Sequence, residues 1–255
     1  MIPNINNFID RFYEIRKMGY IDSIVKESAG VGRTFEQLLG IKGNCDVFPD
    51  YEGIEIKTKT SERYKELSLF NCTPIGESEH EIERLKEKYG YPDKECRKYK
   101  VLFVSVNCLE KSKIGIFYKF QLKVDIDRRK ILLLVFDLKD NLIDESTFWP
   151  LDLIEERFIG KCSTLAFINA EKGYKCGHRS YWYKNLKIMK PKPFEMFIYL
   201  LEKGIIKIDF KVGISKDKEK LGKIFDHGTA FKIDEKNLGM LFDIIYNSNE
   251  EKSSI

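Results

Sequence analysis

The sequence predicts a mixed α/β (α+β) protein, in which helices are interleaved with strands along 255 residues. Apolar residues near the N-terminus recur at helical spacing, the segments that follow alternate between apolar and polar residues, and charged segments with helical spacing separate these strands. A hydrophobic content of 43% and a charged fraction of 33% are typical of a globular protein that buries one large core or two smaller ones.

Two helices are predicted before the first strand. Residues 5–19 place apolar side chains on one helical face and end at a glycine, which stops a helix. The second helix begins at Thr34, whose hydroxyl is a good N-cap, and ends at Gly40. The pattern then changes from helical to alternating.

The later elements follow from that alternation and from the turn residues between its segments. Two long strands meet in a hairpin at residues 127–129. The polar segment 248–255 is expected to be a disordered tail. The predicted strands are 53–58, 67–72, 101–106, 116–127, 130–138, 163–170, 181–189 and 205–213, and the predicted helices are 78–89, 151–158, 194–203 and one that starts at residue 234.

Composition excludes several classes of protein. The first ten residues have asparagine where a signal peptide has an apolar core, and the longest aliphatic run, 131–136, is too short to cross a bilayer. Six cysteines are scattered without a C-x-x-C pair, which indicates a reduced, cytoplasmic protein rather than a zinc ribbon or a redox protein. A net charge of +4 permits a polyanionic partner but does not by itself predict one.

The segment from residue 48 to residue 57 carries the strongest chemical pattern. Asp50 ends a turn, and Glu55 and Lys57 then alternate along a strand, so that both face one side while Ile54 and Ile56 pack into the core. Hydrolysis of a phosphodiester needs a hard cation held by carboxylates, an activated water and charge stabilisation at the phosphate. Two carboxylates and an ammonium on one surface can supply these functions.

We therefore predict that Asp50 and Glu55 hold Mg²⁺, with the Ile56 carbonyl as a further ligand, and that Lys57 orients the attacking water. Glu36, on the helix just upstream, could reach the same group of side chains. The spacing alone is weak, because residues 137–139 and 209–211 also fit the (D/E)-x-K pattern, and an exposed ion pair is the alternative. Only the first triplet has Pro-Asp and a glycine shortly upstream.

Four segments resemble the MvaI/BcnI restriction enzymes, and the first three of them also resemble the related mismatch-repair nickase MutH. Gly-Val-Gly-Arg-Thr-Phe-Glu-Gln-Leu-Leu at 30–39, Pro-Asp at 49–50 and Gly-Ile-Glu-Ile-Lys-Thr at 53–58 resemble their catalytic region. Asp-His-Gly-Thr-Ala-Phe-Lys-Ile at 226–233 is similar to a DNA-recognition segment of the MvaI/BcnI group. The order and spacing of the elements between them agree, so the resemblance covers nearly the whole chain.

The resemblance implies a PD-(D/E)xK restriction-endonuclease-like core and two lobes around a DNA cleft: a catalytic lobe at 1–110 and a recognition lobe at 111–247. It implies a monomer that binds double-stranded DNA, with no stable protein partner, a cognate DNA methyltransferase in the same system, and Mg²⁺ or Mn²⁺ as cofactor. It marks Asp50, Glu55 and Lys57 as catalytic, with Glu36 as an auxiliary acid. A further catalytic lysine expected from MutH has no secure place near residues 98–100.

The resemblance also implies that Asp209, Lys211 and His227 face base edges. Residues 205–212 alternate, which places Lys207, Asp209 and Lys211 on one strand face. A carboxylate can accept from cytosine N4 and a lysine can donate to guanine, so this face is suited to a G·C pair. Together with the resemblance, this predicts a short G·C-rich, near-palindromic site of the CC-N-GG kind. Lysine stands at 211 and 232 where an MvaI-like pattern leads us to expect arginine, so the pattern does not fix the target sequence. A solvated charged strand is the alternative to base reading.

Three functions remain open on the sequence alone. The first is a Type II restriction endonuclease, which the C-terminal recognition segment favours. The second is a MutH-like nicking endonuclease of mismatch repair, which shares the fold and the metal chemistry. The third is a DNA-binding module without catalysis, which the presence of all three catalytic residue types disfavours.

Overall fold

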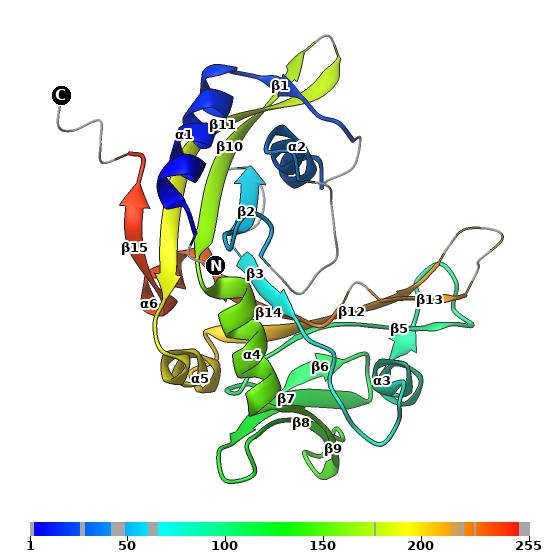
Figure 1. Cartoon of the computed structure of the whole chain (residues 1–255). Coiled ribbons are helices and arrows are strands. Elements are labelled where there is room, and N and C mark those ends of the chain that lie inside the picture. Colours follow the sequence, from blue (N-terminus) through cyan, green and yellow to red (C-terminus); the bar gives the residue numbers. More distant parts are fainter. Residues whose placement is uncertain are drawn as a thin grey trace. The chain divides into compact units, whose positions relative to one another are not determined.

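The computed structural model describes residues 3–25, 29–41, 49–60, 66–175, 177–215, 217, 219, 222–226 and 228–249 (Figure 1). The chain divides into two compact units. Unit 1 comprises Met1–Lys65, Phe158–Lys192 and Gly239–Ile255, and unit 2 comprises Glu66–Arg157 and Pro193–Leu238. Each unit is therefore built from separate stretches of chain, and their boundaries differ from the contiguous ranges 1–110 and 111–247 expected from the sequence.

Unit 1 contains a sheet with the strand order β1-β11-β10-β2, and β15 also pairs with β11. The strands are β1 (Ile21–Asp22), β2 (Glu55–Thr60), β10 (Leu165–Lys175), β11 (His178–Pro191) and β15 (Phe242–Asn247). β2 runs parallel to β10, whereas the other pairs are antiparallel. This parallel pair aligns Glu55 with Leu165 and Lys57 with Phe167.

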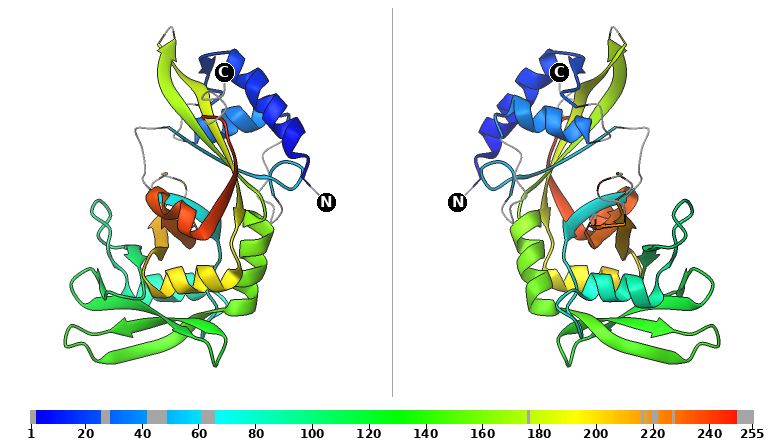
Figure 2. Two further views of the ribbon diagram at one scale, coloured as in Figure 1. Left: turned by 90° about the vertical axis from the view of Figure 1, so that its left-hand side faces the viewer. Right: turned by 90° about the vertical axis from the view of Figure 1, so that its right-hand side faces the viewer.

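Two helices of unit 1, α1 (Ile5–Lys17) and α2 (Gly30–Leu38), lie on the same side of the β10–β11 hairpin (Figure 2). Phe8, Phe12 and Ile15 project from one face of α1 because they recur at helical spacing. They share a core with Phe35 of α2 and with Ile54, Ile56, Ala166, Ile168, Ala170, Tyr181, Tyr183, Leu186 and Ile188 of the sheet region. The predicted N-terminal helix is confirmed.

Unit 2 contains two further sheets. One has the order β3-β14-β12-β5-β4, with β13 also paired to β12, and the other has the order β6-β7-β8-β9. The strands are β3 (Glu66–Asn71), β4 (Tyr91–Pro92), β5 (Lys100–Val106), β6 (Ser112–Ile114), β7 (Tyr118–Asp125), β8 (Lys130–Phe136), β9 (Leu142–Pro150), β12 (Ile206–Ile214), β13 (Ile224–Asp226) and β14 (Ala230–Asp234). The helices are α3 (Glu81–Tyr89) and α5 (Phe194–Glu202), while α4 (Leu151–Cys162) crosses the boundary between the units.

Aromatic side chains join the two sheets of unit 2. The ring of Phe210 on β12 lies 6.0 Å from that of Phe120 on β7 and 6.1 Å from that of Trp149 on β9, centroid to centroid. Trp149 and Phe120 are fully buried. The four-stranded sheet therefore covers the Phe210 face of β12, and the opposite face of this strand is left to its polar residues.

A buried ionic network ties α3 to β9 in unit 2. Arg84 donates to Glu81 and to Asp144, which lies 3.0 Å away, and its side chain is 15% exposed. Burial opposes ionisation of Glu81, but hydrogen bonds from Arg84 and Thr147 hold its pKa below the usual range. The pKa of Asp144 is also lowered, because hydrogen bonds from Tyr89, Ser146 and Arg84 outweigh its burial. Both carboxylates are thus stabilised in their charged form.

Three predictions about local structure are wrong. Thr34 is not an N-cap, because α2 begins at Gly30 and the Thr34 hydroxyl accepts from the Ile24 amide at 3.2 Å. The last predicted helix is a short 3-10 turn (Glu235–Asn237) and a four-residue helix, α6 (Leu238–Leu241), before the chain enters β15. Ser248 is buried rather than part of a tail, since its backbone and hydroxyl both hydrogen bond to the Leu186 backbone. Residues 250–255 lie outside the described residues.

Candidate active site and DNA-recognition face

A tight turn brings Asp50 beside the start of β2. Tyr51 and Ile54 exchange backbone hydrogen bonds of 3.0 and 2.7 Å, and the two residues between them, Glu52 and Gly53, both have positive φ, at 44° and 85°. Such a turn favours glycine, because a side chain at Gly53 would be strained. Asp50 Oδ2 then accepts from the Ile56 amide at 2.9 Å. The glycine ahead of the strand therefore positions the aspartate.

Glu55 lies between two lysines. Its side chain is 5% exposed, Oε1 accepts from Lys57 Nζ at 2.6 Å, and Oε2 accepts from Lys161 Nζ at 3.2 Å. Ile54 and Ile56 are buried in the core of unit 1. The predicted alternation along β2 is confirmed, and it places the carboxylate and the ammonium together.

Glu36 on α2 belongs to the same electrostatic group. Burial raises its pKa, the carboxylates of Asp50 and Glu55 raise it further, and the charges of Lys57 and Arg33 oppose this shift. Its Oε1 also lies near β2: a Cβ built on Gly32 would be 3.6 Å from this oxygen and 3.2 Å from Thr58 Oγ1. The structure thus brings the four predicted catalytic side chains together in unit 1.

The oxygens at this site suit a hard cation, although the described part of the chain contains no ready-formed group of three or more His, Cys, Asp or Glu side chains for a metal. Asp50, Glu55 and the Ile56 carbonyl are oxygen donors of the type that Mg²⁺ prefers. Each carboxylate has lone pairs beyond the hydrogen bonds described above. The mutual repulsion that helps to raise the Glu36 pKa is the kind that a divalent cation relieves. The residues therefore fit a divalent metal.

Lys161 is the residue of this site that sequence reasoning missed. It lies in the last turn of α4, 106 positions after Glu55, and no spacing rule connects the two residues. The parallel pairing of β2 with β10 brings the end of α4 to the start of β2, since Glu55 N also donates to Thr164 O at 2.9 Å. The adjacent Cys162 is buried, which raises its pKa to about 12, so it remains a protonated thiol.

Three of the predicted recognition residues, Asp209, Lys211 and Lys232, lie in unit 2. With Lys207 and Glu66 they form one charged face, which we call the recognition face. Ile206, Ile208, Phe210 and Val212 are buried behind it, as the alternation predicts. Lys232 on β14 forms a close ion pair with Asp209, and Lys211 Nζ lies 3.8 Å from the same carboxylate. Glu66 lies 3.6 Å from both Lys207 and Lys232. His227 lies outside the described residues.

The two lysines beside Asp209 differ in their electrostatics. Burial and the nearby Lys232 charge lower the pKa of Lys211. Burial also opposes the charge of Lys232, but its hydrogen bond to Asp209 outweighs this and raises its pKa. Lys211 is 43% exposed, whereas Lys232 is 14% exposed. Lys211 is thus the accessible donor, and Lys232 fixes the carboxylate.

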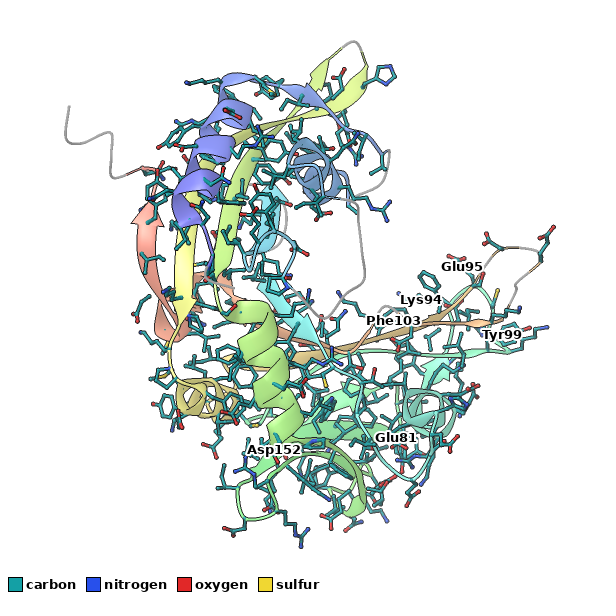
Figure 3. The ribbon with its side chains drawn as sticks, viewed as in Figure 1. Glu81, Lys94, Glu95, Tyr99, Phe103 and Asp152 are labelled. Atoms are coloured by element: carbon teal, nitrogen blue, oxygen red, sulfur yellow. The ribbon has the colours of Figure 1, made fainter. Side chains whose placement is uncertain are left out.

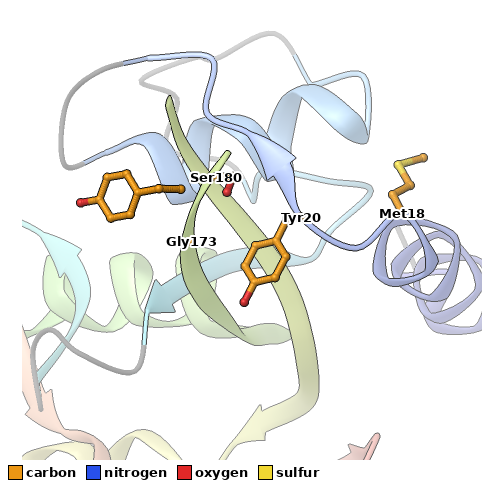
Figure 4. Close-up of a pocket in the computed structure, with 5 residues that line it drawn as sticks. Met18, Tyr20, Gly173 and Ser180 are labelled. Carbon is orange, nitrogen blue, oxygen red and sulfur yellow. The ribbon is translucent and has the colours of Figure 1, made fainter. Parts of the chain in front are cut away.

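A pocket of about 590 Å³ opens elsewhere in unit 1 (Figure 4). Met18 and Tyr20, between α1 and β1, line it together with Gly173 and Tyr174 of β10 and Ser180 of β11. It includes none of the predicted catalytic residues. The shape of this pocket therefore gives no support to the candidate active site, which is defined by its charged side chains instead.

The family model of the MvaI/BcnI restriction endonuclease family matches residues 9–242. The chain belongs to this family. The solved structure described as "Restriction endonuclease MvaI-cognate DNA substrate complex" is similar to it, with a TM-score of 0.87, 27% identity, and coverage of 96% of this chain and 98% of that chain. "Restriction endonuclease MvaI in the absence of DNA" has a TM-score of 0.60 and 25% identity, with coverage of 96% and 97%. A search of curated proteins gave no match.

These matches confirm the predicted fold class and the resemblance to the MvaI/BcnI family. The protein is a Type II restriction endonuclease of this family and hence a site-specific DNA nuclease. Membership favours this function over the MutH-like nickase and over a DNA-binding module without catalysis. Within the described residues, no helix is both long and apolar enough to span a membrane.

Proposed function

We propose that this nuclease hydrolyses phosphodiesters of double-stranded DNA with Mg²⁺, using Asp50, Glu55 and Lys57, at a short G·C-rich site read by the recognition face. The observation that carries the proposal is the buried Glu55, held between Lys57 and Lys161 and beside the Asp50 turn. A buried carboxylate between two ammonium groups places metal-binding oxygens next to positive charges that can stabilise a phosphate of bound DNA. A structural ion pair needs only one such partner.

Each side chain has a distinct part in this proposal. Asp50 and Glu55 hold the metal, and the Ile56 carbonyl is a further ligand. Mg²⁺, and Mn²⁺ in its place, supplies charge neutralisation at the phosphate and a more acidic water when bound. Lys57 orients the attacking water and donates to the phosphate, and Lys161 adds a second positive charge on the other side of Glu55. Glu36, with its raised pKa, is an auxiliary acid.

The recognition face is chemically suited to a G·C pair. Asp209 can accept from the cytosine N4 amino group, and Lys211 can donate to guanine O6 and N7 in the major groove. Lys232 orients Asp209 through their ion pair, and His227 is proposed as a further donor. A near-palindromic CC-N-GG site is the form we propose. Lysine is a single point donor, whereas arginine makes a bidentate contact. We therefore expect Lys211 and Lys232 to influence which base sequence is selected.

The protein acts as a monomer, since one chain carries one candidate cluster, and it cuts the two strands in turn. It works beside a DNA methyltransferase of the same specificity, and in the cytoplasm, as the scattered cysteines lead us to expect. Unit 1 holds the catalytic residues and unit 2 the recognition face, so the two lobes of the proposal are the two compact units.

The deciding experiment is incubation of the purified protein with plasmid DNA, with Mg²⁺, with Mn²⁺ and with EDTA, followed by sequencing of the ends. We expect defined ends within one short G·C-rich sequence, only when a metal is added. The double variant Asp50→Ala, Glu55→Ala should leave the plasmid intact yet still bind it. Normal Mg²⁺-dependent cleavage by this variant would refute the catalytic assignment.

Base reading is tested separately with Asp209→Ala. This change should cost roughly 1 to 3 kcal/mol of discrimination at a single base pair, because one acceptor is lost. Asp152→Ala, on an exposed aspartate of α4 that Figure 3 labels, is the matched control and should keep full selectivity. If Asp209→Ala cuts the same site with unchanged selectivity, Asp209 does not read bases.

A further inference from the structure

Phe103 occupies an unusual place on the recognition face. It lies on β5 directly opposite Lys211 of β12, and side chains opposite one another across antiparallel strands share a face. Its neighbour Leu102 is fully buried, whereas Phe103, which Figure 3 labels, is 46% exposed. An exposed aromatic ring therefore stands beside the accessible lysine of this face.

The Phe103 ring lies over a glycine of the neighbouring strand. A Cβ built on Gly213 of β12 would lie 3.2 Å from Phe103 Cζ and 3.8 Å from Cε2, so the ring lies against the strand where Gly213 has no side chain. Phe225 of β13, opposite Gly213, is 53% exposed. One end of the recognition face is thus apolar, while the end around Asp209 is charged.

We propose that Phe103 is a specificity-determining residue that contacts the C5-methyl group of a thymine next to the base pair read by Lys211. This inference rests on the proposed base reading by the recognition face. A phenylalanine has no hydrogen-bonding group, so it cannot read the donors and acceptors of G, C or A. The thymine methyl is the one apolar group that unmodified bases present in the major groove, and phenylalanine is among the side chains that contact it.

Strand spacing supports contact with a neighbouring base pair. Adjacent strands lie about 4.8 Å apart, and base pairs rise about 3.4 Å. A side chain one strand away from Lys211 therefore reaches one or two base pairs further along the groove. The ring already lies over Gly213 of β12, so we expect it to lose little side-chain freedom when DNA binds. The target then contains or adjoins an A·T pair beside its G·C pairs.

The test compares duplexes that carry the mapped site with thymine or with deoxyuridine, which lacks only the methyl group, at one position at a time. Initial cleavage rates are measured at limiting DNA. Burial of one methyl group predicts that the wild-type protein prefers thymine about fourfold at one position in or beside the site. Phe103→Ala should remove this preference, and Phe103→Leu, which keeps an apolar side chain, should retain part of it.

Phe117→Ala is the matched control, because Phe117 is 62% exposed in unit 2 on the turn before β7 and lies outside the recognition face. It should keep the full preference for thymine. No preference at any position in the wild-type protein, or an unchanged preference in Phe103→Ala, would overturn the inference. The absence of any defined cleavage site would instead refute the proposed function itself, so the two failures are distinguishable.

Discussion

Replacement of Glu55 by glutamine tests the candidate active site most directly. The change keeps the shape of the side chain but removes a charge that lies 2.6 Å from Lys57 Nζ and 3.2 Å from Lys161 Nζ. Loss of one partner from a buried ion pair typically costs about 3 to 5 kcal/mol. Because the two lysines are 25% and 18% exposed and can turn toward water, we expect roughly 2 to 3 kcal/mol of lost stability.

The effect on catalysis should be larger than the effect on folding. A metal at such a site contributes several kcal/mol to the transition state, and about 4 kcal/mol corresponds to roughly a thousandfold in rate. DNA binding should be retained or become tighter, because two lysines lose their internal partner and can pair with phosphates. Glu55→Gln should therefore separate binding from cleavage.

Three measurements check this expectation: urea denaturation, single-turnover cleavage of plasmid DNA with Mg²⁺, and fluorescence anisotropy of a labelled duplex without the metal. Glu14→Gln is the matched control, since Glu14 is an exposed glutamate of α1 in the same unit, and it should match the wild-type protein in all three. A Glu55→Gln protein that cuts within tenfold of the wild-type rate would refute the reasoning. So would one whose binding is lost together with its activity.

Three other predictions follow from the structure. A monomer with one cluster should convert supercoiled plasmid to a nicked form before the linear form appears; a tight dimer in sedimentation, with no nicked species, would contradict this. Lys161→Met should slow single-turnover cleavage roughly a hundredfold, and an unchanged rate would exclude Lys161 from the chemistry. The pKa values of Glu81 and Asp144 are lower in the folded protein than in the unfolded chain, where they are about 4. These two carboxylates therefore stabilise the fold at pH values above about 4. The free energy of unfolding should thus fall as the pH drops below about 4, and less so in Asp144→Asn, as urea denaturation at several pH values would show.

The sequence pattern correctly predicted features that depend only on neighbouring residues in the chain. The alternation around Glu55 and Asp209 gave the correct strand faces, because side chains in a strand alternate whatever the strand pairs with. The same reasoning failed for Thr34, which looks like a helix cap but instead accepts a hydrogen bond from Ile24 within the fold. A threonine hydroxyl accepts a backbone hydrogen bond both as a helix cap and elsewhere in a fold, so the sequence alone cannot distinguish the two roles.

Long-range pairing explains what could not be predicted. Lys161 reaches Glu55 only because β2 pairs with β10. Residues 242–247 form β15 because they add to the edge of β11, and Ser248 is held by the backbone of Leu186. None of these partners is close in sequence, and strand preference depends on such neighbours. The sequence alone therefore could not predict which stretches of chain make up each compact unit.

The interleaving of unit 1 has a consequence for how the enzyme is made. β2 carries Glu55 and Lys57, but its parallel partner β10 is synthesised more than 100 residues later. A parallel strand has no stable place in a sheet without its neighbour, and non-local pairs form late in folding. A ribosome-bound chain that has exposed only its first half therefore lacks the second lysine and the support for the first. We expect cutting activity to appear only after most of the polypeptide has emerged, so that prematurely terminated products are harmless to the genome of the cell that makes them.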